Sequence, residues 1–291
     1  MSIILQLLVN GIIAGAIYSL VASGFSLIYS TNKFIHFAHG AVIAFSAYVL
    51  YYLFSVLELN FVLAVILSIV FASFLGYVMN LLVYKQLRKK HASYVILLIA
   101  SVGILMLLQS LILILFGADI KTIGLIKITK GLQFWGVFIT PLQILIVFLS
   151  LILLAGFYFF MKKSKFGKAM RAVSDNRDVA EIVGISSEKV YSWSFIIGSA
   201  IAGVAAILIG LEQNLTPTMG TSLMIKGFAA AIIGGIGSTY GAVLGAFLLG
   251  IVENFGIGYL PSGYKDAIAF IILFIFLLIR PQGILGIKRR S

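Results

Sequence analysis

The organisation of this chain follows from residues 162–190, KKSKFGKAMRAVSDNRDVAEIVGISSEKV, the one long segment that resembles a soluble sequence. It carries seven of the 21 Lys and Arg residues and four of the nine acids of the chain. Between these charges, apolar residues recur at helical spacing and Gly184 offers a helix end, which predicts two short helices. The rest of the chain is apolar, so we expect this segment to project from a membrane bundle into the cytoplasm, where a soluble partner can bind it.

Composition places the chain among proteins that cross a membrane many times. Of its 291 residues 62% are hydrophobic and 10% charged, and the mean hydropathy is +1.15, far from soluble composition. The net charge of +12 is interpreted as topology and contact with anionic lipid rather than nucleic-acid binding, because the cations adjoin apolar spans. The chain has no Cys and three His, so thiolate chemistry is excluded and neither a metal nor a cofactor is expected.

The distribution of Lys and Arg predicts the orientation in a multi-pass cell-membrane protein. KQLRKKH, residues 85–91, has four cations and no acid, so the positive-inside rule places it in the cytoplasm with 162–190 and the terminal IKRRS. The N-terminus is then outside, the C-terminus inside, and residues 117–140 outside despite their lysines. Residues 1–291 form a single transmembrane domain. The predicted spans are 3–29, 34–57, 61–84, 93–116, 141–161, about 191–212, a short helix of about a dozen residues from near 225, a longer helix to about 257, and 266–281.

The glycine-rich block GGIGSTYGAVLG predicts one broken helix. Gly234, Gly235 and Gly237 crowd one turn, and such density should interrupt the helix. Irregular backbone at membrane depth survives only where protein covers it or where it lines a cavity. The predicted all-α fold therefore has nine crossings, or eight if the short helix is re-entrant. Gly237, Gly241, Gly245 and Gly250 form a stripe of small residues on one helix face, and together with Gly234 and Gly235 it is expected to pack helices closely within this chain or against a second subunit.

Two motifs resemble nucleotide-binding fingerprints but have the wrong spacing. Gly235, Gly237 and Gly241 read GxGxxxG instead of GxGxxG, and no βαβ unit surrounds them. Lys168 follows Gly167, but the remaining residues of a GxxxxGK[ST] phosphate loop are absent. No clustered set of acids, His or nucleophiles suggests an enzyme. We therefore expect a transport subunit without an ATPase site, whose energy comes from a partner.

Polar residues within the spans are costly and often functional, so they are candidates for the pathway or for polar contacts in the bundle. His36 and His39 lie near the start of the second span, without nearby acids. We expect them to form hydrogen bonds at the cytoplasmic end rather than to bind a metal. Lys226 is expected to snorkel to the external interface rather than to act in transport. The remaining candidates are Asn10, Gln109, Glu253 and Asn254.

Four separated blocks resemble the LivH-type permeases of branched-chain amino acid ABC importers. The order and spacing of these blocks over nearly the whole chain carry the resemblance. It implies a hydrophobic amino-acid uptake system of the inner membrane, with a second related permease, two cytoplasmic ATPase subunits that bind the ATP, and an extracytoplasmic substrate-binding protein. The blocks are FIHFAHGA at 34–41, SKFGKAMRAVSDNRDVAEIVGI at 164–185, GGIGSTYGAVLG at 234–245 and RPQGILG at 280–286.

In that family the long cytoplasmic loop contains a coupling helix that fits a groove of the ATPase. The resemblance places this helix between Asn176 and Gly184 and implies that closure of the ATPases moves the loop and tilts the flanking spans. The coupling residues that it implies are Gly167, Arg171, Asp175, Asn176, Ala180, Glu181 and Gly184.

Two alternatives stay open at this point. Relatives that carry urea or short-chain amides share the same blocks, so the blocks do not fix the substrate, which a binding protein would select. An ion-coupled secondary carrier would suit the broken helix and Glu253, and it would need no partner. The purified chain in liposomes with an ion gradient separates the two classes, because a carrier would transport alone and a permease subunit would be inert.

Overall fold

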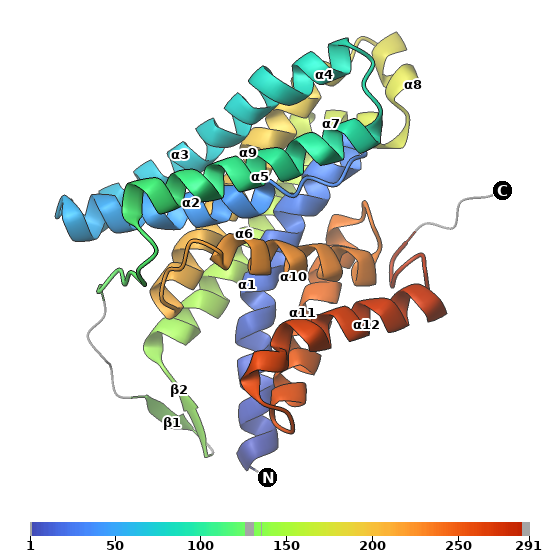
Figure 1. Ribbon diagram of the computed structural model, residues 1–291. Coiled ribbons are helices and arrows are strands. Elements are labelled where there is room, and N and C mark those ends of the chain that lie inside the picture. The colour runs from blue at the N-terminus through green and yellow to red at the C-terminus, as the bar shows by residue number, and fades with distance from the viewer. Residues whose placement is uncertain (1, 126–130, 135, 287–291) are drawn as a thin grey trace.

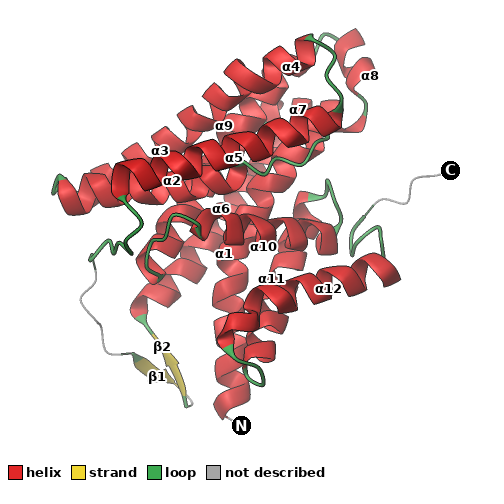
Figure 2. Ribbon diagram, in the orientation of Figure 1, coloured by secondary structure: helices red, strands yellow, loops and turns green. Residues whose placement is uncertain are grey.

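The computed structural model describes residues 2–125, 131–134 and 136–286, and nearly all of them are helical (Figures 1 and 2). The protein is an all-α polytopic membrane protein, as the sequence predicts. The strands β1 and β2 form an antiparallel hairpin in the loop before α6, with Leu132 opposite Ile139. The elements are α1 Ser2–Asn32, α2 His39–Tyr51, the π turn η1 Tyr52–Val56, α3 Phe61–Met79, the π turn η2 Asn80–Tyr84, α4 Lys85–Lys89, α5 Tyr94–Phe116, β1 Leu132–Phe134, β2 Val137–Ile139, α6 Pro141–Lys163, α7 Lys165–Asp175, α8 Arg177–Ile182, α9 Ser187–Glu212, α10 Met219–Gly234, α11 Thr239–Ile257, the 3-10 turn η3 Ser262–Tyr264 and α12 Lys265–Ile279.

Seven helical segments in the described part of the chain are long and apolar enough to cross a membrane. Helices α10 and α12 are shorter, with 16 and 15 residues, so the count of nine crossings remains a prediction. The second span begins at His39 instead of residue 34. The third runs without interruption through η2 and α4 to Lys89, so most of the basic segment expected as a loop is the end of a helix.

Local sequence signals explain how α6 begins. The Thr140 hydroxyl accepts a hydrogen bond from the Gln143 backbone N–H at 3.2 Å, and the Gln143 side chain accepts one from the Thr140 N–H at 3.0 Å. This reciprocal capping box satisfies two otherwise unpaired donors, and Pro141 occupies the first turn, where its missing N–H costs nothing. The predicted start of the fifth span is thereby confirmed.

Helices α1 and α9 form the centre of the bundle. α1 packs against α9, α10 and α11, and α9 also packs against α2 and α3. Small residues allow the closest of these approaches, because a Cβ on Gly11 of α1 would lie 2.7 Å from the Cα of Ile251 on α11. Helices α3, α5 and α6 leave most of their surface uncovered, as expected for helices that face lipid.

The predicted break in the glycine-rich region is present between α10 and α11. Gly235 and Gly237 adopt φ values of +115° and +89°, a backbone conformation open mainly to glycine. The helix before the break begins at Met219, earlier than the predicted start near 225. The C-terminal segment covers this break, since Ile284 and Leu285 donate backbone hydrogen bonds to the carbonyls of Ile233 and Gly234 at 2.9 and 2.8 Å.

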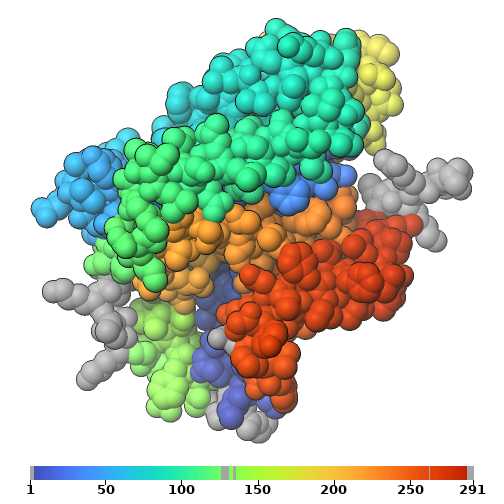
Figure 3. Space-filling view, viewed as in Figure 1, coloured from blue at the N-terminus to red at the C-terminus, as the bar shows by residue number. Residues whose placement is uncertain are grey.

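The ends of the molecule differ in charge. The N-terminus and the β hairpin lie at one end, and α4, α7 and α8 gather at the other (Figure 1). This separation agrees with the orientation drawn from the positive-inside rule, which remains a prediction. In the space-filling view α12 covers part of the front face (Figure 3), where it packs on α10 and α11. The cations of the terminal IKRRS, which support the predicted orientation, and Lys127 and Lys130, which count against it, lie outside the described residues, as does Trp135.

Candidate functional site

Helix α8 and the residue that follows it expose three apolar side chains. Val179, Ile182 and Val183 are 54%, 84% and 68% exposed, while Ala180 is buried against the rest of the loop. Large apolar side chains that are grouped and exposed on a charged loop mark an interaction surface more often than a stable free surface. We call Val179, Ile182 and Val183 the α8 surface.

Polar contacts hold α8 in its conformation. The Asn176 side chain caps the helix by accepting a hydrogen bond from the Val179 N–H at 3.1 Å, and Gly184 ends it with φ +85°. Arg177 forms an ion pair with Glu181 at 3.1 Å, and the Ser187 hydroxyl donates to the same carboxylate oxygen. The Ser187 hydroxyl and then the Arg177 guanidinium lower the pKa of Glu181, because both stabilise its charged form.

Helix α7 joins this loop to the membrane bundle. Gly167 packs so closely on α6 that a Cβ there would lie 2.6 Å from the Cα of Met161. Arg171 donates to the Lys162 carbonyl at 3.3 Å, and Asp175 is exposed at the end of α7. The predicted coupling residues therefore stabilise the conformation of the loop. The exposed apolar side chains of the α8 surface lie beside them. The spacing of these apolar side chains in the sequence predicts a helix but does not predict a site.

Arg88, on α4, connects the ends of three helices beside the loop that carries α7 and α8. Its guanidinium binds both carboxylate oxygens of Glu188, at the start of α9, at 3.0 and 3.1 Å. It also donates to Asn80 at 2.8 Å and to Asn32 at 3.4 Å, and it lies 4.7 Å from the ring centroid of Tyr191. A bidentate pair of this kind fixes geometry as well as charge. The ends of α1, α3 and α9 are thus fastened together at one side chain.

A second contact reaches this junction from the loop itself. The ammonium group of Lys33, just after α1, donates to the Ser174 carbonyl on α7 at 2.6 Å. Sequence reasoning treated Arg88 and Lys33 only as orientation signals. In a cluster of cations, the sequence does not show which side chain turns toward the interior. The contact of Arg88 with Glu188, which is 100 residues away in the chain, could therefore not be predicted.

The two candidate histidines lie in the interior near the same end. His36 Nδ1 forms a hydrogen bond with the Tyr84 hydroxyl at 3.0 Å, as expected for a bundle contact. His39 packs beside Gly24, and its ring lies near the backbone of Val21. Within that same part of the chain, no group of three His, Asp or Glu side chains could hold a metal ion.

A buried polar cluster joins α1, α10 and α11. The Lys226 ammonium lies 2.8 Å from Oε1 of Glu253 and donates to the Tyr18 hydroxyl at 3.2 Å. Lys226 is only 7% exposed and Glu253 is fully buried, so the expectation that Lys226 snorkels to the interface is wrong. Tyr18 and Glu253 provide internal partners on two other helices, and pairing inside protein removes the need to reach water.

The cluster extends to the surface through α12. Asp266, in the first turn of α12, lies 3.3 Å from the Lys226 ammonium and also accepts a hydrogen bond from Ser222. The other polar candidates occupy separate positions. Asn254 donates to the Gly250 carbonyl at 2.9 Å, Asn10 accepts from Gln6 at 3.0 Å, and Gln109 is half-buried on α5, which packs mainly on α2.

The five candidate packing glycines have three different surroundings. Gly234, Gly241 and Gly245 lie where α10 and α11 touch, since a Cβ on Gly241 would collide with the Gly234 carbonyl and one on Gly245 with the Ala230 carbonyl. Gly235 instead meets the C-terminal segment, where a Cβ would lie 2.6 Å from the Gly286 nitrogen. Gly237 serves the turn, because a Cβ there would touch nothing in the described part of the chain.

The apolar helices and the charged loop that carries α7 and α8 define the class of the protein as a polytopic membrane protein. The chain belongs to the family described as the permease component of branched-chain amino acid transport systems, whose model matches residues 7–277. Curated relatives agree over almost their full length. BraD, a high-affinity branched-chain amino acid transport permease of Pseudomonas aeruginosa, is 34% identical and covers 97% of this chain and 95% of its own.

Two further relatives carry the same kind of name. LivH of Escherichia coli K12, also a high-affinity branched-chain amino acid transport permease, is 31% identical over 97% of this chain and 95% of its own. A probable LivH of Methanocaldococcus jannaschii is 32% identical, with 97% and 92% covered. Among solved structures, a chain of PsaBC from Streptococcus pneumoniae in complex with Fab has a TM-score of 0.52 at 15% identity, covering 94% of this chain and 91% of that one. This last likeness concerns the fold alone.

Proposed function

We propose that this chain is a permease subunit of an ABC importer for branched-chain amino acids, driven by ATPase subunits that bind the α8 surface. The names of the relatives support the substrate class. The observation that carries the coupling role is the exposure of Val179, Ile182 and Val183 on a loop otherwise rich in charge. ATP would be bound by the partner subunits, and no covalent step takes place in this chain.

The contacts of α7 and α8 suggest how a displacement of α8 by the ATPase subunits would be transmitted to the helices of the transport pathway. Motion of α7 would act on α1 through the Lys33 contact with Ser174 and on α9 through the short connection after Gly184. Arg88 ties α9 to α3 and α1. These three helices would therefore move as a unit, while α5 and α6, which have fewer contacts with the centre, provide the surface against which they tilt.

A substitution on the α8 surface tests the coupling role. Ile182→Asp places a charge in the proposed contact without touching a buried residue, so insertion and folding should be unchanged. We expect co-purification of the ATPase subunits and uptake of leucine both to fall at least ten-fold. Ile182→Met, which keeps an apolar side chain of similar size, is the matched control and should retain both. Normal ATPase association in Ile182→Asp would refute the assignment of α8.

A second experiment addresses the substrate and the mode of energy supply. The complete assembly, reconstituted in liposomes with ATP inside and the binding protein outside, should accumulate leucine, isoleucine and valine. Uptake of urea or a short-chain amide in preference to these would overturn the substrate proposal and leave the ATPase coupling intact. Transport by the purified chain alone under an ion gradient would instead support a secondary carrier.

A further inference from the structure

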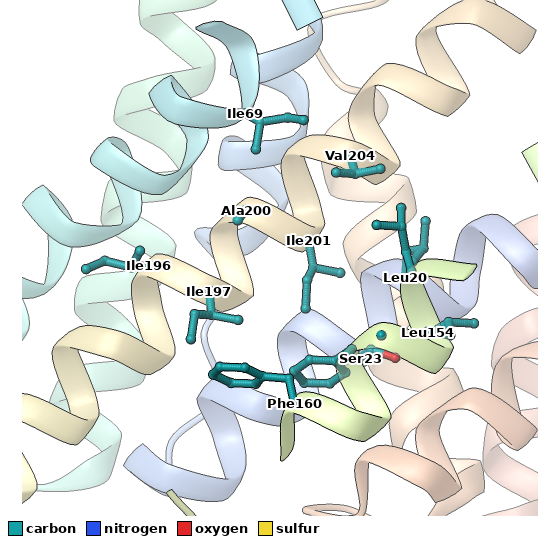
Figure 4. Close-up of a pocket in the computed structure, with 13 residues that line it drawn as sticks. Leu20, Ser23, Ile69, Leu154, Phe160, Ile196, Ile197, Ala200, Ile201 and Val204 are labelled. Atoms are coloured by element: carbon teal, nitrogen blue, oxygen red, sulfur yellow. The ribbon is translucent and has the colours of Figure 1, made fainter. Parts of the chain in front are cut away.

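Two grooves lie along the same side of α9. The membrane groove has a volume of about 340 Å³ and is formed by α1, α3, α6 and α9 (Figure 4). Ser23 is the only polar side chain among its thirteen lining residues. The interface groove, of about 280 Å³, lies at the end of α9 that meets the α7–α8 loop and is lined by α7, residues 185–186 and the first turns of α9.

One face of α9 runs through both grooves. Lys189 and Trp193 line the interface groove, and Ile197, Ala200 and Val204 line the membrane groove. Their spacing of three or four residues places them on one helical face, and Figure 4 shows the last three following one another along the helix. From Trp193 to Val204 the helix rises about 16 Å, close to the roughly 15 Å of one hydrocarbon leaflet.

The chemistry of the interface groove suits an anionic headgroup. Lys165 and Lys189 are its only charged lining residues, and both are exposed. Neither ammonium group forms an ion pair with any described residue. The neighbouring Lys162 and Lys163 lie over the rings of Tyr158 and Phe159. The two free cations therefore point to a ligand of opposite charge.

The aromatic residues of this groove indicate the depth at which it lies. The rings of Phe166 and Trp193 pack 5.0 Å apart, and the two side chains are 50% and 41% exposed. Aromatic side chains at the end of a membrane span favour the level of the lipid headgroups, with Lys and Arg beside them on the cytoplasmic side. A charged end at this level and an apolar groove one leaflet deep match the shape of a phospholipid.

We propose that the two grooves bind one anionic phospholipid of the leaflet at the α7–α8 end. Its phosphate would lie between Lys165 and Lys189, and one acyl chain would follow α9 past Ala200. The lipid would brace α7 against α9, the two helices that flank the proposed coupling loop. This site is independent of the transported substrate and of the ATPase contact.

Fluorescence of a single tryptophan tests the site directly. The sequence holds two tryptophans, so Trp135→Phe leaves Trp193 as the only tryptophan of the full-length chain, which is purified and placed in phosphatidylcholine nanodiscs. Brominated phosphatidylglycerol at low mole fraction should quench Trp193 more strongly than brominated phosphatidylcholine. Lys165→Gln and Lys189→Gln should each lower this preference about five-fold, the effect of one cation near an anionic membrane surface.

Two matched variants make the result specific. Lys168→Gln removes an exposed cation of α7 that does not line the groove, and it should keep the preference. Ala200→Phe fills the membrane groove and should reduce quenching by brominated phosphatidylglycerol to the level of phosphatidylcholine. Equal quenching by the two lipids in the parent chain would show unselective lipid contact, and absence of quenching by both would show that protein covers this face. Either outcome overturns the proposal.

Discussion

Arg88 and Glu188 meet through two parallel hydrogen bonds of 3.0 and 3.1 Å, although 100 residues separate them in the chain. Arg88 has 13% of its side chain exposed, so most of the pair lies away from water. Asn80 and Asn32 bind the same guanidinium. The Arg88–Glu188 pair is therefore part of a hydrogen-bond network and is not an isolated surface contact.

Arg88→Lys should separate the role of the charge from that of the geometry. Lysine keeps the positive charge but cannot form the bidentate pair while also reaching Asn80. We expect a loss of about 2 kcal/mol of stability, seen as a lower melting temperature of the detergent-extracted chain, and a several-fold drop in uptake. Lys85→Arg, at the start of the same helix, is the control and should be neutral. A melting temperature equal to that of the parent would contradict a structural role for the bidentate Arg88–Glu188 pair.

The Lys226–Glu253 pair should show strong coupling in a double-mutant cycle. Lys226→Met leaves the Glu253 carboxylate buried without its cation, which costs about 3–5 kcal/mol when one member of a buried pair is removed. Lys226→Met combined with Glu253→Gln leaves no unpaired charge between these two positions and should recover much of the loss. Thermal unfolding of Lys226→Met, of Glu253→Gln and of the double variant measures the coupling. Additive losses would show that the two side chains do not depend on each other.

The α8 conformation should depend on pH only in acid. The folded-state pKa of Glu181 lies below its usual value of 4.5, so the contribution to stability is complete above that value and is lost as pH falls through the folded pKa. Hydrogen exchange of α8 should therefore be constant from neutral pH down to about 5, after correction for the intrinsic rate, and rise below. Glu181→Gln should show the raised exchange at neutral pH. A transition near neutral pH would point to another group.

Glycine substitutions should separate packing from helix propensity. Gly241→Ala places a methyl group against the Gly234 carbonyl, so we expect loss of the folded chain from the membrane. Gly103→Ala is the matched control, because a Cβ there meets nothing in the described part of the chain and alanine is the better helix former by roughly 1 kcal/mol. The membrane level of each variant, measured with a C-terminal tag, checks this. Equal levels would refute the packing role of Gly241.

Two further changes in the loop should uncouple transport from insertion. Gly184→Trp forces a bulky side chain into a left-handed conformation of φ +85°, and Arg171→Glu removes the hydrogen bond to the Lys162 carbonyl while reversing the charge. Both should abolish leucine uptake and leave the amount of chain in the membrane unchanged. Normal uptake in both variants would argue against transmission through α7 and α8.

Much of the fold could be predicted because its signals are local. The apolar runs, Pro141 and the glycine-rich break fix where α6 begins, where α10 ends and where α11 begins. The two short helices before Gly184 follow in the same way from spacing. What these signals could not give is register between helices, since an apolar helix in lipid can be rotated without changing its composition.

The polar contacts could not be predicted, because they depend on how the helices are rotated and shifted against one another. Glu253 was identified as a candidate, yet its partner Lys226 was expected at the interface, because a lysine side chain near a loop has water within reach. Only the packing of α1 and α10 against α11 shows that Tyr18 and Glu253 lie closer to it. The roles of Arg88 and of the α8 surface were missed for the same reason, since burial is a property of neighbours that sequence spacing does not specify.

The backbone bonds from Ile284 and Leu285 to the end of α10 have a consequence for biosynthesis. A message truncated after the codon for Arg280 would still encode every helix, yet the carbonyls of Ile233 and Gly234 would lose the donors that cover them. The nascent chain can therefore form the contact between this segment and the end of α10 only once Leu285 has left the ribosome. Degradation of such a shortened product, despite its intact hydrophobic segments, is what cellular quality control should produce.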